Sequence, residues 1–335
     1  MEWKEVKVLV TGGASFIGSH LVDALVARGA AVTVVDDLSS GRLENIKEHL
    51  DKGKISFLAD DLLGGVAARA MTGVKVVFHL AAKHGGRGYV DHRQAECSSN
   101  LALDGIIFKA ALETGVEKVV YASSGCVYPN FIQADPKEEL YLSEAMVGPP
   151  YDADNMYGWA KLMGEFTLKA YYAQCGLKSV SCRYFAVYGP RALESHSVIA
   201  MIARAFLRED PFRVWGTGEQ VRNWTYVDDI VEGTILAAGK INDGSAVNLG
   251  TTERISVLNA AREVLGQTGH KAEIMTQPDM PTGPMNRVAD NRLGKQLLGW
   301  EPKVAFREGL RRTIDWYFRC KDARQVRVDL NRMAD

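Results

Sequence analysis

The chain has 335 residues, 47% of them apolar, and a formal net charge of −1 at pH 7. This length allows a large core with two lobes, and the near-neutral charge argues against nucleic acid or a membrane surface as a partner. No apolar run reaches the ~20 residues of a membrane span, and the N-terminus lacks the pattern of a signal peptide. The five cysteines have neither disulfide nor zinc spacing, which predicts a reduced, cytoplasmic protein with no bound metal.

Apolar runs of strand length alternate with helical periods through the first half of the sequence. The expected buried strands are residues 6–10, 31–35, 55–58, 74–80 and 119–122, and the main expected helices are residues 16–28, 92–113 and 155–175. Strands that alternate with helices in this way predict an α/β fold of the Rossmann type, with a doubly wound parallel sheet.

The pattern loosens after residue 178. A strand-like run at 179–184, helices near 198–207 and 228–240, and joints rich in Gly and Pro predict a smaller C-terminal α/β lobe. We therefore expect one domain over residues 1–178 and a second mainly over residues 179–335, with some later segments returning to the first. The last dozen residues are charged and are expected to form a loose tail.

A glycine-rich turn joins the first expected strand to the first expected helix. Gly12 permits the tight turn, Gly18 permits close packing of the helix on the sheet, and backbone N–H groups at the helix start can face a pyrophosphate. Asp36 ends the second strand, where a carboxylate can bind both ribose hydroxyls of NAD and repel the extra phosphate of NADP. Ser15 replaces a usual glycine and would restrict approach to the phosphates if its φ were positive. The first domain is thus predicted to bind NAD.

Tyr157 and Lys161 are separated by one helical turn and therefore project from the same face of the expected helix. A free tyrosine has a pKa near ~10, and a nearby lysine cation favours its phenolate. Ser124 follows the fifth expected strand. The tyrosine and lysine alone would fit an ordinary amphipathic helix, but with Ser124 and the glycine-rich turn they indicate proton transfer beside a nicotinamide.

With these residues placed, the sequence resembles the extended short-chain dehydrogenases/reductases, in particular the nucleotide-sugar epimerases and dehydratases, over residues 6–318. The segments that carry the resemblance include Thr11-Gly12-Gly13-Ala14-Ser15-Phe16-Ile17-Gly18, His79-Leu80-Ala81-Ala82, Tyr157 with Lys161, Tyr188-Gly189-Pro190 and Arg222-Asn223-Trp224-Thr225-Tyr226-Val227-Asp228-Asp229. The resemblance implies that Tyr157 is the acid/base for a sugar hydroxyl, that Ser124 binds the same oxygen, and that Lys161 holds the nicotinamide ribose.

The resemblance also implies a set of binding residues and a homodimer. Contacts to NAD are expected from Gly12, Ser15, Phe16, Ile17, Gly18, Asp36, Asp37, Ser39, Asp61, Leu62, Leu80, Ala81, Ala82, Asn100, Tyr157, Lys161 and Tyr184. Contacts to a nucleotide-sugar substrate are expected from Lys83, Gly86, Arg87, Ser124, Arg222 and Arg287, with the last two clamping its diphosphate. Relatives commonly dimerise through two helices per subunit, here residues 92–113 and 155–175.

The reaction within this group depends on Cys126. Sequences resembling 4,6-dehydratases have Asp-Glu where this chain has Gly125-Cys126. The segment 123–129 resembles GDP-mannose 3,5-epimerase and GDP-fucose synthase, which place a cysteine here, and the glycine-rich segment 81–89 resembles the plant-type mannose epimerase. Cys126 can therefore serve as an acid/base on C5 or C3 of a C4 ketone, or it can be a compact apolar residue under the sugar.

The partner of Cys126 is less well marked, because the loop after Tyr188-Gly189-Pro190 has no lysine. His196 is the expected second acid, with His84 and Lys83 as alternatives. The leading hypothesis is an NAD-dependent nucleotide-sugar epimerase that inverts C5, C3 or both. The alternatives are a C4 epimerase of the UDP-glucose or UDP-glucuronate type, a dehydratase or reductase that uses the same ketone, and a non-catalytic NAD-binding sensor.

Overall fold

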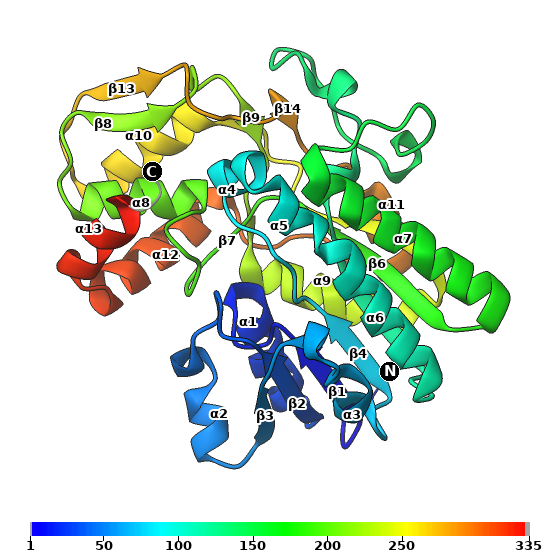
Figure 1. Ribbon diagram of the computed structural model, residues 1–335. Coiled ribbons are helices and arrows are strands. Elements are labelled where there is room, and N and C mark those ends of the chain that lie inside the picture. Colours follow the sequence, from blue (N-terminus) through cyan, green and yellow to red (C-terminus); the bar gives the residue numbers. More distant parts are fainter. Residues whose placement is uncertain (1, 332–335) are drawn as a thin grey trace.

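The computed structural model describes residues 2–331, and its centre is a seven-stranded sheet (Figure 1). In spatial order the strands are β11 (Asp243–Leu249), β6 (Lys178–Tyr184), β5 (Lys118–Ser124), β4 (Val76–His79), β1 (Lys7–Thr11), β2 (Ala31–Asp36) and β3 (Ile55–Ala59). All neighbouring strands run parallel. The chain moves outwards from β1 to β3 and then returns to β4 on the other side of β1, which is the order reversal of a doubly wound sheet. The predicted Rossmann-type fold is confirmed.

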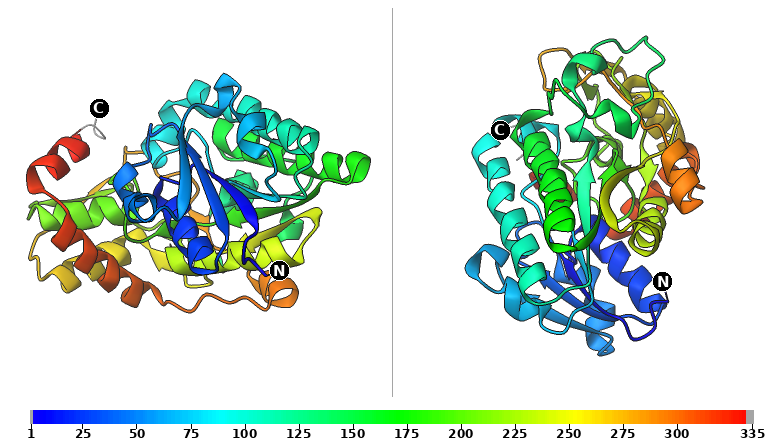
Figure 2. Two further views of the ribbon diagram at one scale, coloured as in Figure 1. Left: turned by 90° about the horizontal axis from the view of Figure 1, so that it is seen from below. Right: turned by 90° about the vertical axis from the view of Figure 1, so that its right-hand side faces the viewer.

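Helices cover both faces of this sheet (Figure 2). Helices α1 (Phe16–Ala27) and α9 (Val227–Lys240) lie against one face. Helices α3 (Ala67–Met71), α6 (Asn100–Glu113) and α7 (Asn155–Cys175) lie against the other. The bounds of α7 are those predicted from the sequence.

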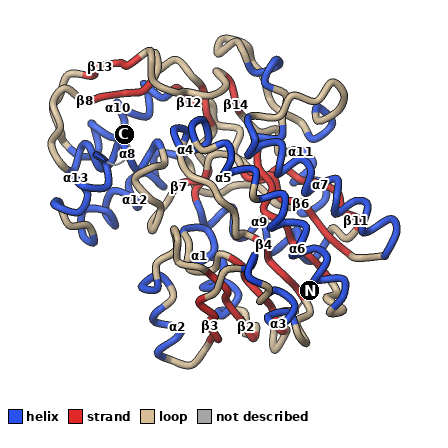
Figure 3. The backbone as a smooth tube through the Cα atoms, in the orientation of Figure 1, coloured by secondary structure: helices blue, strands red, loops and turns tan. Residues whose placement is uncertain are grey.

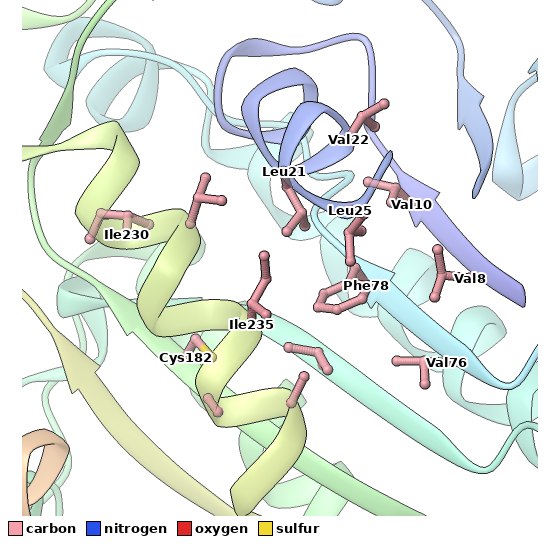
Figure 4. Close-up of a cluster of buried hydrophobic side chains, with 14 of the residues drawn as sticks. Val8, Val10, Leu21, Val22, Leu25, Val76, Phe78, Cys182, Ile230 and Ile235 are labelled. Atoms are coloured by element: carbon pink, nitrogen blue, oxygen red, sulfur yellow. The ribbon is translucent and has the colours of Figure 1, made fainter. Parts of the chain in front are cut away.

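The apolar layer between the sheet, α1 and α9 follows from residue spacing (Figure 4). Successive strand side chains point to opposite faces, so Val10 lies in this layer and Leu9 lies in the layer under α6. Leu21 and Leu25, four residues apart on α1, face the sheet together with Ile235 of α9. Each face of the sheet therefore has its own core.

A smaller lobe lies beyond the carboxyl ends of the strands, at the upper left of Figure 1. Its strands are β7 (Val187–Tyr188), β8 (Phe212–Trp215), β9 (Val221–Arg222), β10 (Thr225–Tyr226), β12 (Ile255–Ser256), β13 (Ile274–Gln277) and β14 (Asn286–Arg287), and its helices are α8 (Ser197–Phe206), α10 (Val257–Thr268), α12 (Phe306–Cys320) and α13 (Ala323–Asn331). Trp224 and Phe306 pack in its separate apolar core, with 5.4 Å between ring centroids.

The remaining elements are short. They are the helices α2 (Lys47–Asp51), α4 (Arg87–His92), α5 (Gln94–Ser98) and α11 (Arg292–Leu298), and the 3₁₀ turns η1 (Leu43–Asn45), η2 (Leu62–Gly64), η3 (Gly125–Val127), η4 (Asn130–Gln133) and η5 (Glu144–Met146). Within residues 2–331 we find neither a helix with the length and apolar character of a membrane span nor a cluster of three potential metal ligands.

Several elements from residue 178 onward belong to the large sheet and its cover, namely β6, α9, β11 and α11. Strand β6 lies inside the sheet between β5 and β11, with five of its seven residues buried. These elements are the ones to which the expected return of later segments would apply. The division between residues 178 and 179 stays a prediction.

The predicted single helix 92–113 is wrong, because the structure has α4, α5 and α6 in succession. The backbone of Arg93 leaves the helical region, with φ −108° and ψ 48°. The side-chain amide of Gln94 donates to the carbonyls of Val90 and Asp91, which a continuous helix would pair with backbone N–H groups. The chain can therefore change direction between α4 and α5.

The predicted loose C-terminal tail is also wrong for the residues that the structure describes. Helix α13 begins after Asp322, whose carboxylate accepts hydrogen bonds from the backbone N–H groups of Arg324 and Gln325. Val326 is buried in the core of the smaller lobe. A single buried apolar residue in a largely polar segment gave little indication of a packed helix. Residues 332–335 of the expected tail lie outside the described part.

A buried ion pair joins β6 to α7. The guanidinium of Arg183 donates to both carboxylate oxygens of Glu165, at 2.9 and 2.8 Å, and the two side chains are 4% and 1% exposed. Ser123 also donates to this carboxylate. Two parallel hydrogen bonds between buried charges hold the helix in one position on the sheet.

We expect Arg183→Met to lower the free energy of unfolding by about 3–5 kcal/mol, because Glu165 would stay buried without its partner. Urea unfolding followed by circular dichroism measures the change. The matched control is Arg69→Met, which removes an exposed pair with Asp60 and should cost at most about 1 kcal/mol. Equal losses in the two variants would contradict the structural role of the buried pair.

Candidate active site

A cavity of about 440 Å³ opens at the carboxyl ends of the sheet strands and extends into the smaller lobe. Figure 3 shows the loops that connect the two parts of the molecule in this region. Of the predicted site residues, Gly12, Ser15, Phe16, Ile17, Asp36, Asp37, Ser39, Asp61, Leu62, Leu80, Ala81, Ala82, Lys83, Gly86, Arg87, Ser124, Cys126, Tyr157, Lys161, Tyr184, His196, Arg222 and Arg287 line it. Side chains from distant parts of the sequence therefore meet in one space.

Two predicted residues, Gly18 and Asn100, support the cavity without lining it. A Cβ on Gly18 would lie 2.1 Å from the carbonyl oxygen of Gly12, so only glycine lets α1 approach the turn. The side-chain amide of Asn100 binds both the N–H and the carbonyl of Lys83, at 2.7 and 3.0 Å. Both residues thus position backbone that lines the cavity.

The nucleotide end of the cavity begins at the turn between β1 and α1. Gly12 has φ +70°, and a Cβ there would lie 2.9 Å from the backbone nitrogen of Ala81. Ser15 has φ −79°, so the expected restriction from a positive φ does not arise. Its hydroxyl instead donates to the Gly12 carbonyl at 2.5 Å. Serine is therefore compatible with the turn.

Asp36 is buried at the end of β2. Its carboxylate accepts hydrogen bonds from the backbone N–H groups of Ala14 and Leu38, each at 2.9 Å. Burial raises the pKa of Asp36, and these two hydrogen bonds oppose that effect. A carboxylate offers about four acceptor positions, so two backbone bonds leave capacity for ribose hydroxyls.

Lys83 lies at this same end, which favours a contact with the cofactor over the predicted contact with the substrate. Its Nζ is 3.0 Å from Asp37 Oδ2 and 3.4 Å from Ser39 Oγ. This pair joins the loop after β4 to the loop after β2. The pairing of Lys83 with Asp37 was not predicted, because the two residues are 46 positions apart in the sequence.

Tyr157, Lys161 and Ser124 meet at the centre of the cavity. Lys161 Nζ lies 5.8 Å from the centroid of the Tyr157 ring and has no hydrogen-bond partner among residues 2–331. Burial lowers the pKa of Lys161. Burial also raises the pKa of Tyr157, negative charge on Cys126 adds to the effect, and the Ser124 hydroxyl opposes it. A partner for the buried ammonium is therefore needed, and ribose hydroxyls fit that requirement.

Cys126 lies directly against the first turn of α7. A Cβ on Gly158 would be 2.4 Å from the carbonyl oxygen of Cys126, and the Asp154 N–H donates to that oxygen at 2.8 Å. Close approach at Gly158 therefore fixes the cysteine beside Tyr157. The thiol is half-buried and lies 3.2 Å from Nη1 of Arg287.

Asp154 is the main site residue that sequence reasoning missed. Its carboxylate is 2.7 Å from Nη1 of Arg87 and 3.0 Å from Nη1 of Arg287. Burial opposes ionisation of Asp154, but Arg287 and Arg87 outweigh it and hold its pKa below the ordinary value. The only signal in the sequence was an acidic residue before a helix, which usually indicates a cap.

Arg87 also pairs with the carboxylate of Asp91, and Arg222 lies nearby without a carboxylate in contact within residues 2–331. Three arginines therefore face two carboxylates, which leaves surplus positive charge. Arg222 donates to the carbonyls of Val221 and Thr282. Burial, together with repulsion from Arg287 and Arg87, lowers the pKa of Arg222 to about 9. Nη2 of Arg287 is buried without a partner among the described residues. A diphosphate would relieve this repulsion and supply acceptors.

His84 and His196 lie at the side of the cavity. Their ring centroids are 5.5 Å apart, and His84 is 5.8 Å from the Tyr157 ring. The His84 side chain is exposed to the cavity, and burial by the surrounding residues lowers the pKa of its imidazole. Burial and then His84 lower the pKa of His196 to about 3. His196 is therefore neutral at pH 7 and has a second ring between itself and Tyr157.

Comparison with known proteins identifies the group to which this arrangement belongs. Residues 8–250 match the model of the NAD dependent epimerase/dehydratase family. The chain belongs to this family. The resemblance read from the sequence is thus confirmed, and the family's cofactor, NAD, is also that of this chain.

Individual relatives within the family differ in reaction. A UDP-glucose 4-epimerase of Mycolicibacterium smegmatis is 32% identical over 93% of this chain and 98% of its own length. A GDP-mannose 3,5-epimerase of Oryza sativa subsp. japonica is 30% identical over 93% of this chain and 82% of its own length. The crystal structure of UDP-glucuronic acid 4-epimerase from Bacillus cereus, with UDP-glucuronic acid and NAD, has a TM-score of 0.85 and 27% identity, and the match covers 94% of this chain and 100% of that one.

We expect Gly18→Ala to bind NAD more weakly and to lose about 1–3 kcal/mol of stability, because its methyl group would push α1 away from the turn. Cofactor titration and thermal unfolding measure the two effects. Gly266→Ala in α10 is the matched control, because a Cβ there meets no atom within 4 Å. Unchanged NAD affinity in Gly18→Ala would contradict the role assigned to this glycine.

Proposed function

We propose that the chain is an NAD-dependent nucleotide-sugar epimerase that acts through a transient C4 ketone, with Cys126 assisting epimerisation at C5, C3 or both. Enzymes of this family use NAD, which when bound supplies reversible hydride transfer with the sugar. The observation that carries the proposal is the position of Cys126. Its thiol lies in the same cavity as Tyr157 and next to the guanidinium of Arg287.

Each residue around the sugar has its own proposed role. Tyr157 takes the proton of the C4 hydroxyl, with Ser124 on the same oxygen and Lys161 supplying positive charge. A ketone at C4 makes the protons on C3 and C5 acidic, so Cys126 can exchange one of them. Arg87, Arg222 and Arg287 give the cavity the positive charge that a nucleotide diphosphate requires.

The second proton-transfer group is better placed at His84 than at the predicted His196. The His84 ring is the nearer of the two to Tyr157 and is exposed to the cavity. A neutral imidazole can accept a proton on one nitrogen and release one from the other. We therefore propose that Cys126 and His84 exchange protons with the sugar carbon.

A plain C4 epimerase is the second candidate. The likeness to UDP-glucose 4-epimerase is as close as that to GDP-mannose 3,5-epimerase. In this reaction the ketone would be reduced on its other face, and Cys126 would only fill space. A dehydratase or a reductase could start from the same ketone, and a sensor would bind NAD without turnover. Turnover by the wild type and its loss in Tyr157→Phe distinguish an enzyme from a sensor.

We expect wild-type enzyme in D₂O to introduce deuterium at C5 or C3 of its substrate, because a carbon acid exchanges its proton with solvent. GDP-mannose, UDP-glucose and UDP-glucuronate are the substrates to examine by NMR. Cys126→Ser should lower exchange by about 10²–10⁴-fold, the usual contribution of a general acid or base. Inversion at C4 without deuterium would favour the C4 epimerase.

Two controls make this experiment specific. Cys175→Ser removes an exposed thiol at the end of α7 and should leave exchange unchanged. His84→Gln should lower exchange more than His196→Gln. The reverse order would restore His196 as the second acid.

We also propose a homodimer formed through α6 and α7. Their outer faces expose apolar side chains, including Leu101 (43%), Ile106 (36%), Trp159 (38%) and Met163 (45%). Such a patch on two adjacent helices is suited to burial against a second copy.

A cytoplasmic location suits the proposed epimerase, since Cys126 must stay a free thiol to act.

We expect the double substitution Trp159→Glu and Met163→Glu to produce a monomer, because two charges would be buried in the interface. Sedimentation velocity measures the mass. Leu297→Glu is the matched control, because Leu297 is 40% exposed on α11, away from α6 and α7. A dimer that survives the double substitution would place the interface elsewhere.

A further inference from the structure

A buried row of side chains runs beneath the catalytic lysine. It begins at Thr11 at the end of β1, continues through His79 of β4 and Asp104 of α6, and ends at Tyr121 of β5. All four residues are at most 3% exposed. Lys161 Nζ lies 4.6 Å from the centroid of the Tyr121 ring. The row therefore connects the turn that holds NAD with the ammonium group in the active site.

The hydrogen bonds determine where the protons lie. Thr11 Oγ1 accepts from the backbone N–H groups of Leu80 and Ala81, each at 3.2 Å, so its own proton is donated to His79 Nδ1 at 2.7 Å. The remaining proton of a neutral His79 is then on Nε2, which donates to Asp104 Oδ1 at 3.0 Å. Burial lowers the pKa of His79, with Asp104 opposing, which agrees with a neutral ring.

Asp104 receives a second hydrogen bond from the opposite side. The Tyr121 hydroxyl donates to Asp104 Oδ2 at 2.5 Å. Burial raises the pKa of Tyr121, and the Asp104 charge adds to this, so the tyrosine keeps its proton. With two donors, and no cation in direct contact among residues 2–331, Asp104 is a buried carboxylate whose charge acts on its surroundings.

Lys161 is the cation on which that charge acts. Burial disfavours its ammonium form, and Asp104 is the charge that favours it. The other titratable groups facing this region are Tyr121 on β5, His79 on β4, His84 after β4, Cys97 on α5, Cys126 in η3 and Tyr157 on α7. Glu165 on α7 is already neutralised by Arg183.

We propose that Asp104 is a positioning residue that keeps the buried Lys161 ammonium charged and thereby promotes phenolate formation at Tyr157. It does not line the cavity, and its effect on the tyrosine passes through the lysine. The proposal rests on the proposed role of Tyr157 as acid/base. Acting alone, the negative charge of Asp104 would disfavour the phenolate, because like charges repel. If Asp104 promotes formation of the phenolate, its effect must therefore pass through Lys161.

The experiment is a double-mutant cycle of Asp104→Asn and Lys161→Met in the NAD-bound enzyme. The readout is the ultraviolet absorbance of tyrosinate, with the Tyr157→Phe counterpart of each variant subtracted to isolate Tyr157. Where unfolding precedes titration, the tyrosinate fraction is compared at the highest pH at which all variants stay folded. The amide introduced by Asp104→Asn can keep both hydrogen bonds by accepting from His79 and donating to the Tyr121 oxygen.

We expect Asp104→Asn to give several-fold less tyrosinate when Lys161 is present and more tyrosinate when Lys161 is replaced by methionine. A change of the same sign in both backgrounds, or no change with Lys161 present, overturns the proposal. No sugar substrate is needed, so the test does not depend on which reaction the enzyme catalyses. Loss of turnover in Tyr157→Phe tests that proposed function separately.

A second measurement uses the wild-type protein and does not depend on folding of the variants. The side-chain NMR signals of Lys161, assigned by comparison with Lys161→Met, report whether its amine is protonated. We expect a charged ammonium at neutral pH in spite of complete burial. A neutral amine at neutral pH would refute the role of Asp104.

Discussion

The carboxylate of Asp154 connects the start of α7 to both sides of the cavity. It precedes α7, which carries Tyr157 and Lys161, and it pairs with Arg87 at the start of α4 and Arg287 from β14. A buried charge is stable only when it is paired, so the two arginines and the start of α7 must keep a common geometry. The arginines proposed to bind the diphosphate and the residues proposed to exchange protons are thereby set relative to each other.

Close backbone contacts complete this geometry. The approach of Gly158 to the Cys126 carbonyl places the thiol beside Tyr157, and Arg287 reaches the same thiol from the smaller lobe. A side chain at residue 158 would separate η3 from α7. The position of Cys126 beside Tyr157 therefore depends on the absence of a Cβ at Gly158.

The charged groups at and beneath the cavity form two separate sets. At the proposed substrate site, three arginines exceed the two carboxylates of Asp154 and Asp91, which suits an anionic phosphate ligand. Beneath the catalytic lysine, Asp104 stands alone with neutral partners. The first set serves binding of an anion. The second serves the protonation state of Lys161, because a carboxylate with no cation in contact keeps its influence on the nearest ammonium.

Local patterns in the sequence were sufficient for much of the fold. The turn with Gly12 and Gly18, the acid at Asp36 and the bounds of α7 all depend on interactions within a few residues or one helical turn. The break between α4 and α5 could not be predicted this way. It depends on the Gln94 side chain, which competes with the backbone for carbonyl groups and also accepts from the Met156 N–H of α7.

The sequence by itself determined the Rossmann-type sheet and the NAD cofactor. These properties follow from residue type and short-range spacing. Only the tertiary structure decided that Lys83 pairs with Asp37, that Asp154 is shared by two arginines, and that His84 lies between Tyr157 and His196. Such pairings join loops far apart in the chain, and the free energy of a charge depends on what is buried around it.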